Sequence, residues 1–339
     1  IGPMPGGLPV TTALACVFFG AISGSGPATT AAVGMLMIPA MTCRGYHPAY
    51  AAAAAATAGG VGIIIPPSIP MVIYGVSGQQ SITKMFMGGV IPGLLIAASL
   101  CAMHIWINRK RKGDGMAWSA TNLAKSIKDG FWSIMAPTII LGGIYGGIFT
   151  PTEGGAFAAV YALVVCLGYY REIGLRKVLE VSAASARTTA AVMMIVATAT
   201  AIGYFITLAD IPQQIISVFE PFKDSPTTLL LMINVFLFLI GMVMDLTPNV
   251  LIFAPVFYPL ILDAGIDPYH FGLIFILNLG IGVITPPVGT VLYVVCGIGN
   301  IKLPALVKNL LPFIAVEFLM LILITVFPKL SLIPMNWLI

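Results

Sequence analysis

The chain has 339 residues, of which 59% are hydrophobic and only 8% are charged, and its mean hydropathy is +1.02. Soluble domains carry about 25% charged residues, so the composition excludes a water-soluble globular protein. The formal net charge of +4 comes from basic residues clustered between apolar runs, a pattern that reports membrane topology rather than an anionic partner. None of the five cysteines forms a C-x-x-C motif with another, so we expect neither redox nor metal chemistry from them.

Apolar runs separated by short polar or Gly/Pro-rich segments predict an all-helical polytopic membrane protein. The first two runs, 8–22 and 28–41, are each about 15 residues long, short of the roughly 20 that a crossing needs. We therefore expect a re-entrant hairpin with its tip at Ser23–Pro27. Trp118 and other apolar residues among lysines in 113–128 predict an amphipathic arm in the membrane interface. Further helices are expected over residues 50–62, 69–76, 84–108, 131–149, 153–170, 188–208, 227–243, 250–262, 271–282, 288–295 and 303–327.

The run 50–62 consists almost entirely of Ala, Gly and Thr, so neighbouring helices can approach its backbone closely. It is interrupted at Pro66-Pro67, because adjacent prolines remove two N–H donors and force the preceding residue out of helical geometry. The carbonyl groups before the break lose their helical partners, and in hydrocarbon each costs several kcal/mol unless something else coordinates it. We therefore expect this break to be a functional site.

Further along the chain, Thr150, Pro151 and Glu153 occupy the positions of a helix capping box. Thr at the N-cap, Pro at the first helical position and Glu at the third satisfy the free N–H groups of a helix start. We interpret Glu153 as a structural cap rather than a catalytic acid.

The hairpin and the broken helix occur twice, at an interval of 220 residues. Glycines and prolines match in one register, which we interpret as an internal duplication. The matching pairs are Pro39 and Pro259, Gly45 and Gly265, Pro48 and Pro268, Gly60 and Gly280, Gly62 and Gly282, Pro66 and Pro286, Pro67 and Pro287, and Pro92 and Pro312. Two helices, 153–170 and 188–208, precede the second copy, and their counterparts would lie before Ile1. We therefore expect the chain to be a fragment that lacks the opening helices of its first repeat.

Counting the expected crossings places the two hairpins on opposite sides of the membrane, which predicts an inverted-topology repeat. All basic residues except Lys84, Lys223 and Lys329 then fall on one side, which the positive-inside rule makes cytoplasmic. We expect a multi-pass protein of the bacterial inner membrane, with its basic loops in the cytoplasm and its C-terminus in the periplasm.

Each hairpin tip places oxygen-bearing side chains beside a proline-broken helix. They are Ser23, Ser25, Thr29 and Thr30 in the first copy, and Asp245, Thr247 and Asn249 in the second. Oxygen ligands and the negative ends of half-helices suit a hard monovalent cation. The positive ends of the resumed helices, at Ser68 and Val288, suit a carboxylate. Two simpler interpretations stay open, because Asp245 could only cap a helix and Ser23 and Ser25 could only form a turn.

Five motifs span the chain in order, and in combination they are specific although each alone is weak. They are Gly20–Thr29 (GAISGSGPAT), Ile64–Gly75 (IIPPSIPMVIYG), Gly147–Glu153 (GIFTPTE), Gly241–Pro248 (GMVMDLTP) and Gly280–Gly289 (GIGVITPPVG). These motifs resemble the large membrane subunit of TRAP transporters, the DctM family of tripartite ATP-independent periplasmic carboxylate transporters.

The resemblance implies an elevator-type mechanism, in which the hairpins and broken helices form a transport domain that slides against a scaffold. It implies no cofactor beyond coupling sodium ions, bound between each tip and its broken helix. The implied sodium ligands are Ser23, Ser25, Gly60, Ile65 and Pro66 at one site, and Asp245, Thr247, Gly280, Thr285 and Val288 at the other. The implied substrate residues are Thr29, Ser68, Asn249 and Thr290. The implied partners are a periplasmic solute-binding protein and a small four-helix membrane subunit, within the lipid bilayer.

We divide the chain accordingly into transport-domain segments 1–80 and 227–300, scaffold and arm helices 81–226, and a C-terminal arm 301–339. The predicted function is sodium-driven uptake of an organic acid of the C4-dicarboxylate, sugar acid or sialic acid class. One alternative is a stand-alone sodium/dicarboxylate symporter or anion exchanger, and another is a non-transporting membrane scaffold. No nucleophile–base pair, P-loop or nucleic-acid patch is present, so we predict neither an enzyme nor a nucleic-acid-binding protein.

Overall fold

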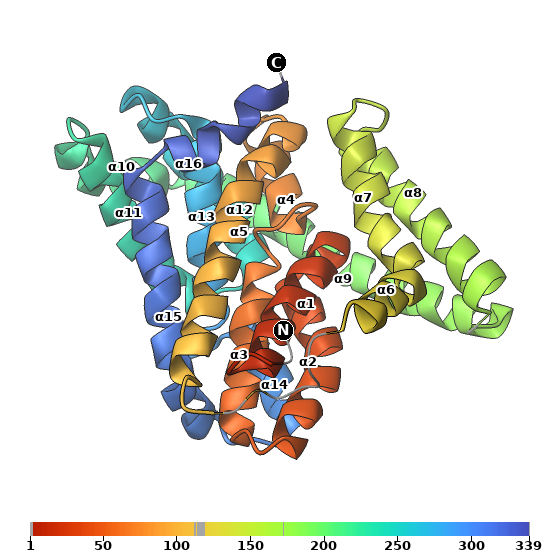
Figure 1. Cartoon of the computed structure of the whole chain (residues 1–339). Helices are drawn as coiled ribbons and strands as arrows, with labels where there is room; N and C mark the ends of the chain where they lie inside the picture. Colours follow the sequence, from red (N-terminus) through yellow and green to blue (C-terminus); the bar gives the residue numbers. More distant parts are fainter. Residues whose placement is uncertain (1–2, 112, 114–118, 172, 339) are drawn as a thin grey trace. The chain divides into compact units, whose positions relative to one another are not determined.

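The computed structural model of the chain describes residues 3–111, 113, 119–171 and 173–338 (Figure 1). Every regular element in these residues is helical. Six of the described helices are long and apolar enough to cross a membrane, which confirms the prediction of an all-helical, multi-pass membrane protein. They are Gly26–Cys43, Ile82–Ile107, Pro151–Tyr170, Leu175–Ile206, Leu246–Asp263 and Leu303–Val326. Trp118 of the expected interfacial arm lies outside the described residues.

The chain forms two compact units. The first consists of Ile1–Ser119 and Pro212–Ile339 and holds both predicted hairpins and both proline breaks. The second consists of Ala120–Ile211. The four-part division expected from the sequence stays a prediction.

The first half of the larger unit is built around one helix of small residues. Its helices are α1 (Gly7–Ser23), α2 (Gly26–Cys43), α3 (Pro48–Val61), α4 (Ile69–Ser77) and α5 (Ile82–Ile107). α3 begins after His47, whose ring accepts the N–H of Ala49 at 3.3 Å. Every residue of α3 from Ala49 to Val61 is buried. Because most of these residues are Ala or Gly, α1, α2 and α15 can pack close to the backbone of α3.

The second half of the same unit has a matching central helix. Its helices are α10 (Ile211–Phe219), α11 (Pro226–Gly241), α12 (Leu246–Asp263), α13 (Pro268–Gly282), α14 (Thr290–Gly299), α15 (Leu303–Val326) and α16 (Lys329–Leu332). α13 is buried from His270 to Gly282 and packs against α5, α11, α12 and α15. α10 lies between the expected helices 188–208 and 227–243 and is not predicted by the sequence, because the segment is too short to give a spanning signal.

Helix boundaries in the two halves repeat at the interval found in the sequence. α2 and α12 begin 220 residues apart and end 220 residues apart, and α3 and α13 begin at Pro48 and Pro268. Gly45 and Gly265 have φ values of 79° and 70°, a left-handed conformation that glycine adopts without steric cost. After each, an N–H reaches back to the carbonyl five residues earlier, at 3.1 and 2.8 Å respectively. The inverted orientation of the two halves and the re-entrant course of the hairpins stay predictions.

The smaller unit contains α6 (Ala120–Asp129), α7 (Phe131–Tyr145), α8 (Pro151–Val164) with a π-helical extension Val165–Tyr170, and α9 (Leu175–Leu208). The predicted capping box is confirmed: the Thr150 hydroxyl accepts the Glu153 N–H at 3.3 Å, and the Glu153 carboxylate accepts the Thr150 N–H at 2.8 Å. α7 and α8 pack together, with the Tyr161 hydroxyl donating to the Trp132 carbonyl at 2.8 Å.

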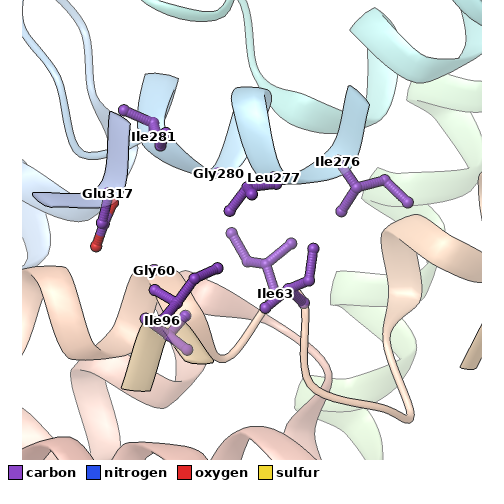
Figure 2. A pocket seen from close by; sticks show the side chains of 10 residues that line it. Gly60, Ile63, Ile96, Ile276, Leu277, Gly280, Ile281 and Glu317 are labelled. Carbon is purple, nitrogen blue, oxygen red and sulfur yellow. The ribbon is translucent and has the colours of Figure 1, made fainter. Parts of the chain in front are cut away.

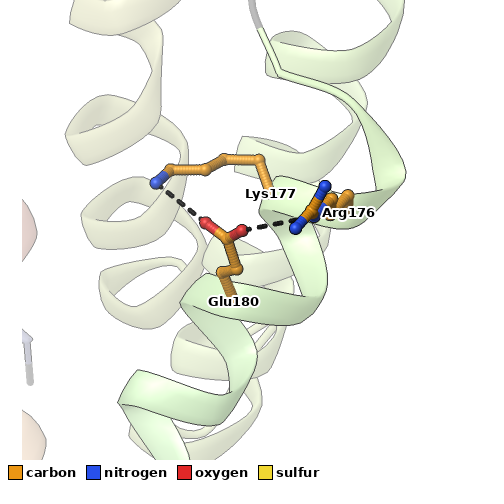
Figure 3. Close-up of polar contacts among 3 residues, drawn as sticks. All are labelled: Arg176, Lys177 and Glu180. Carbon is orange, nitrogen blue, oxygen red and sulfur yellow. Dashed lines mark hydrogen bonds and ion pairs between the residues drawn. The ribbon is translucent and has the colours of Figure 1, made fainter.

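α9 begins at Leu175, well before the expected start at residue 188. Glu180 forms ion pairs with Arg176 at 3.7 Å and with Lys177 at 3.1 Å, on one side of the first turns (Figure 3). Ion pairs at this spacing support helix formation in polar sequence. The prediction was wrong because it followed only the apolar run.

Candidate functional site

The backbone joins the first hairpin tip to the first broken helix. Gly24 has a φ of 64° and donates its N–H to the Gly20 carbonyl at 2.8 Å. Its own carbonyl accepts the N–H of Ile69, the first residue of α4, at 3.2 Å. A Cβ at Gly24 would lie 2.8 Å from the carbonyl oxygen of Pro67. Glycine is therefore required here both by its conformation and by the contact with the break.

Two predicted sodium ligands, Ser23 and Ser25, form this tip and are half-buried. The Ser23 hydroxyl lies 3.3 Å from both the N–H and the carbonyl oxygen of Ser25. This contact supports a turn-forming role for Ser23. The Ser25 hydroxyl makes no hydrogen bond to any residue that the structure describes, so it is the better placed of the two for a ligand.

The first break leaves a group of carbonyls without donors. The Ser68 hydroxyl donates to the Ile63 carbonyl and accepts the Met71 N–H at 3.5 Å, so Ser68 serves as the N-cap of α4. Among the described residues, no donor reaches the carbonyls of Gly62, Ile64, Ile65, Pro66 or Pro67. Ile65 and Pro66 are themselves buried. A cation would satisfy such oxygens, since buried polar groups are normally paired.

The helices around the break meet backbone to backbone. A Cβ at Gly20 would lie 2.7 Å from the Cα of Gly62, where α1 crosses the end of α3. Thr29 and Thr30, in the first turn of α2, are fully buried, and neither hydroxyl has a partner among the described residues. A Cβ at Gly62 would lie 3.1 Å from the Thr29 hydroxyl oxygen. Thr29 therefore lies directly beside the break.

The tip of the second hairpin carries an acidic residue, Asp245. Asp245 is the N-cap of α12, yet its carboxylate makes no capping hydrogen bond and is exposed. Asn249 closes the turn instead, because its Nδ2 donates to the carbonyls of Met244 at 3.1 Å and Asp245 at 3.0 Å. The Asn249 Oδ1 is buried without a partner in the described chain. Thr247, in the same turn, is half-buried. The capping interpretation of Asp245 is therefore not what this geometry favours.

The second break is also joined to its hairpin by a backbone hydrogen bond, within two residues of the positions equivalent to those in the first copy. The exposed residue Val288 donates its N–H to the Met242 carbonyl at 3.2 Å. The buried Thr285 donates its hydroxyl to the Ile281 carbonyl at 2.7 Å, while its own carbonyl receives no donor from the described residues. Thr290 begins α14, and its buried hydroxyl oxygen has no partner there either.

The two predicted glycine ligands, Gly60 and Gly280, face each other across the seam between α3 and α13. A Cβ at Gly60 would lie 3.8 Å from the Gly280 carbonyl oxygen, and one at Gly280 would lie 3.9 Å from that of Gly60. The Gly60 carbonyl accepts the Ile63 N–H at 3.2 Å, whereas the Gly280 carbonyl has no donor among the described residues. Both line a small cavity that also contains Glu317 (Figure 2).

The sequence interpretation missed two polar features in this region. One is Glu317, which could have been found as an acid inside the apolar run 303–327. The other is a buried network in which the Asn278 amide donates to the Asn234 side-chain oxygen at 2.9 Å, and the Asn234 amide donates to the Thr325 hydroxyl at 3.0 Å. It ties α13 to α11 and α15 across the helix core.

Comparison with known proteins gives consistent matches over nearly the whole chain. A family model described as the DctM component of tripartite ATP-independent periplasmic transporters matches residues 1–330. The chain is 42% identical, over 98% of its length, to an isethionate TRAP transporter permease protein of Oleidesulfovibrio alaskensis. It is 40% identical to the 2,3-diketo-L-gulonate TRAP transporter large permease protein of Escherichia coli over 99% of its length. It is also 40% identical, over 100% of its length, to the C4-dicarboxylate TRAP transporter large permease protein of Pseudomonas aeruginosa.

These relatives are longer than the chain. It spans 53% of the Oleidesulfovibrio protein, 80% of the Escherichia protein and 79% of the Pseudomonas protein. All three are named as permease proteins of a transporter.

Proposed function

This chain belongs to the DctM component family of tripartite ATP-independent periplasmic transporters, and we propose that it is the membrane permease subunit of a sodium-driven uptake system for a small organic anion. The family consists of transporter permeases, so the prediction that the chain is not an enzyme is confirmed. One doubled arrangement carries the proposal: each hairpin is hydrogen-bonded to a proline break whose carbonyls lack donors, through Gly24 and Ile69 in one copy and Met242 and Val288 in the other.

The sodium ions bind between each tip and its break. Ser25 and Asp245 occupy equivalent positions at the interval of 220, and each belongs to a hairpin that is hydrogen-bonded to a break with donor-free carbonyls. Hydroxyl, carboxylate and carbonyl oxygens are the ligands that hard cations prefer. The geometry favours the carbonyls of Ile65 and Thr285 as ligands over that of Gly60, which already accepts a hydrogen bond.

The substrate is a small organic anion, because the names of relatives include a sulfonate, a sugar acid and C4-dicarboxylates. The N-terminal ends of α4 and α14 attract an anion through the positive end of the helix dipole. Thr29 and Thr290 have hydroxyls available to donate to it, whereas Ser68 acts mainly by capping α4. Asn249 fits the sodium site better than the substrate site, because its Nδ2 is already engaged and only its acceptor oxygen is available.

We propose the inverted repeat and the elevator motion as the framework for these sites. The repeated helix boundaries support a shared fold for the two halves. The exposed apolar surfaces of α8 and α9 suit lipid or a small membrane subunit. The basic loops are proposed to face the cytoplasm and the C-terminus the periplasm of a bacterial inner membrane. A periplasmic binding protein would deliver the solute.

The test is uptake into proteoliposomes that contain the complete permease with its small subunit. Labelled organic anion is supplied with the binding protein, and an inward sodium gradient is compared with an equal potassium gradient. Uptake that requires both sodium and the binding protein supports the proposal. Sodium-dependent uptake without a binding protein would favour a stand-alone symporter, and no flux with all partners present would favour a scaffold subunit.

A further inference from the structure

The C-terminal end of α5 combines an exposed aromatic ring with exposed positive charge. One face of this membrane-spanning helix is exposed along its length, because Leu94, Ala98, Ala102 and Trp106 follow one another at every fourth position. The side chain of Trp106 is 60% exposed. The guanidinium of Arg109 lies over its indole ring, at 5.4 Å from the ring centre. An apolar face of this kind suits lipid, and Trp is typical of the boundary between lipid and water.

Basic residues continue the chain where this apolar face ends. Four of them, at 109–112, follow α5 directly in the sequence. Arg109 and Lys110 are exposed, and neither forms an ion pair with an acidic residue in the described part of the chain. The two charges therefore lie beside Trp106 and are accessible from outside the protein.

Arg111 has a different role, because it ties the end of α5 to the turn between α2 and α3. Its guanidinium donates to the carbonyls of Arg44 at 2.8 Å and Gly45 at 3.1 Å. The same group lies over the ring of Tyr46, at 4.0 Å from the ring centre. These contacts hold Arg111 against the protein, at the base of the first hairpin, while the side chains of Arg109 and Lys110 stay exposed.

This end of the larger unit carries one sign of charge. Figure 1 shows the start of α15 at the same end as the end of α5 and the turn between α2 and α3. These segments add the exposed basic residues Arg44, Lys302 and Lys308. The acidic residues that the structure describes in the larger unit belong to other segments or to the later turns of α15; they are Glu220, Asp224, Asp245, Asp263, Asp267 and Glu317.

A phospholipid headgroup fits this combination better than a soluble anion does. The planar guanidinium of Arg and the ammonium of Lys are the usual partners of phosphate oxygens. Clusters of Lys and Arg at the end of a membrane-spanning helix are typical of sites for anionic lipids. A soluble anion would use only the charges, whereas a lipid also covers the apolar face that ends at Trp106.

We propose that the end of α5 binds the headgroup of an anionic phospholipid, with Arg109 and Lys110 on the phosphate and Trp106 beside the acyl chains. The site lies on the side of the membrane that is proposed to be cytoplasmic. Because Arg111 joins the same end of α5 to the base of the first hairpin, a bound lipid holds that base at the membrane surface. The lipid site does not depend on the proposed sodium-driven uptake.

Quenching of Trp106 fluorescence by brominated lipids tests the proposal, because bromine quenches tryptophan only at short range. The complete purified permease in neutral detergent is titrated with brominated phosphatidylglycerol or brominated phosphatidylcholine. The Trp106 signal is the difference between each protein and the same protein carrying Trp106→Phe. In the wild type, phosphatidylglycerol is expected to reach half-maximal quenching at about one-fifth of the concentration of phosphatidylcholine, or less. Arg109→Gln combined with Lys110→Gln is expected to abolish this preference.

Arg176→Gln combined with Lys177→Gln is the matched control. It removes another exposed, adjacent Arg–Lys pair, which is already paired with Glu180 at 3.7 and 3.1 Å. The preference for phosphatidylglycerol at Trp106 is expected to persist. Equal loss in the two double variants would mean general attraction to a basic protein, and would overturn the site.

Three results with the wild type would also overturn the lipid site, so the test stands even if the double variant at the end of α5 does not fold. Equal quenching by the two lipids would mean that the headgroup is not recognised. No quenching by either lipid would mean that protein covers Trp106. Loss of the preference in potassium phosphate, compared with potassium chloride of the same ionic strength, would identify a site for soluble phosphate instead.

Discussion

The N–H of Ile69 donates to the carbonyl of Gly24 at 3.2 Å, so the tip of the first hairpin is fixed to the first residue of the resumed helix. The second copy makes a similar backbone bond, from Val288 to Met242 at 3.2 Å, within two residues of the equivalent positions. In each copy the bond holds a tip that carries oxygen side chains beside carbonyls that lack donors. A substitution that separates tip and break is therefore expected to affect ion binding more than overall folding.

Gly24→Ala is expected to abolish sodium-dependent uptake. Alanine in the left-handed conformation costs about 1–2 kcal/mol, and its Cβ would in addition lie 2.8 Å from the Pro67 carbonyl oxygen. The tip must then move away from the break. Sodium dependence of uptake in proteoliposomes measures the effect.

Gly265→Ala is the matched control, because Gly265 has a φ of 70° and no atom within 4 Å of the added Cβ. It is expected to lower the unfolding temperature slightly and to keep uptake sodium-dependent. Equal loss of uptake in the two variants would mean that backbone strain alone is responsible and that the contact between tip and break is unimportant.

Asp245→Asn is expected to raise the sodium concentration needed for half-maximal uptake at least about tenfold, which corresponds to about 1.4 kcal/mol of lost binding energy. The carboxylate is not used for helix capping, so the substitution removes a charge without removing a structural hydrogen bond. The initial uptake rate as a function of sodium concentration measures the change.

Asp263→Asn tests whether any carboxylate of α12 has this effect. Asp263 is exposed and pairs with Lys223 at 3.1 Å, and exposed pairs contribute little to stability. The sodium dependence of uptake by the Asp263→Asn variant is expected to match that of the wild type. A similar shift in both variants would point to a general electrostatic effect rather than to a site at Asp245.

The main parts of the candidate site could be predicted from the sequence, because glycine and proline impose backbone conformation locally. Pro66-Pro67 and Pro286-Pro287 determine the position of both breaks, and the paired glycines Gly45 and Gly265 both lie in the turns that follow α2 and α12. Thr150 predicted the start of α8 for the same reason. Where a residue type strongly favours one backbone conformation, a single sequence is enough to predict the local structure.

What could not be predicted depends on contacts between distant segments. The pairing of Gly24 with Ile69, and the absence of a partner for Glu317, follow from how helices pack and leave no local pattern. α9 was placed too short because the ion pairs of Glu180 lie outside the apolar run. The resemblance implies Asn249 as a substrate residue, but the hydrogen bonds of its amide to Met244 and Asp245 depend on the three-dimensional turn and leave no sequence pattern.

Asn234→Ala is expected to lower the free energy of unfolding by about 1–3 kcal/mol, the usual effect of leaving a buried partner unpaired. Asn234 links Asn278 on α13 to Thr325 on α15, at 2.9 and 3.0 Å. Thermal unfolding of the solubilised permease measures the loss. Asn309→Ala is the control, because Asn309 is half-buried and its one side-chain hydrogen bond among the described residues, to the Ala305 carbonyl at 2.9 Å, is exposed and lies within its own helix. Comparable destabilisation by both variants would contradict a special role for the buried network.

Gly282→Ala and Gly297→Ala are expected to change stability in opposite directions, although both residues are helical. Alanine in place of glycine inside a helix stabilises by about 0.5–1 kcal/mol when there is space for its methyl group. Gly297 has nothing within 4 Å of the added Cβ, so its substitution should raise the unfolding temperature. At Gly282 the same Cβ would lie 2.7 Å from the backbone of Gly241, where α11 crosses the end of α13. The helices must separate there, which lowers the unfolding temperature and moves the second hairpin away from its break, so sodium-dependent uptake should fall with it. If Gly282→Ala were as stable as Gly297→Ala, the close crossing that positions the second cation site would not exist in the protein.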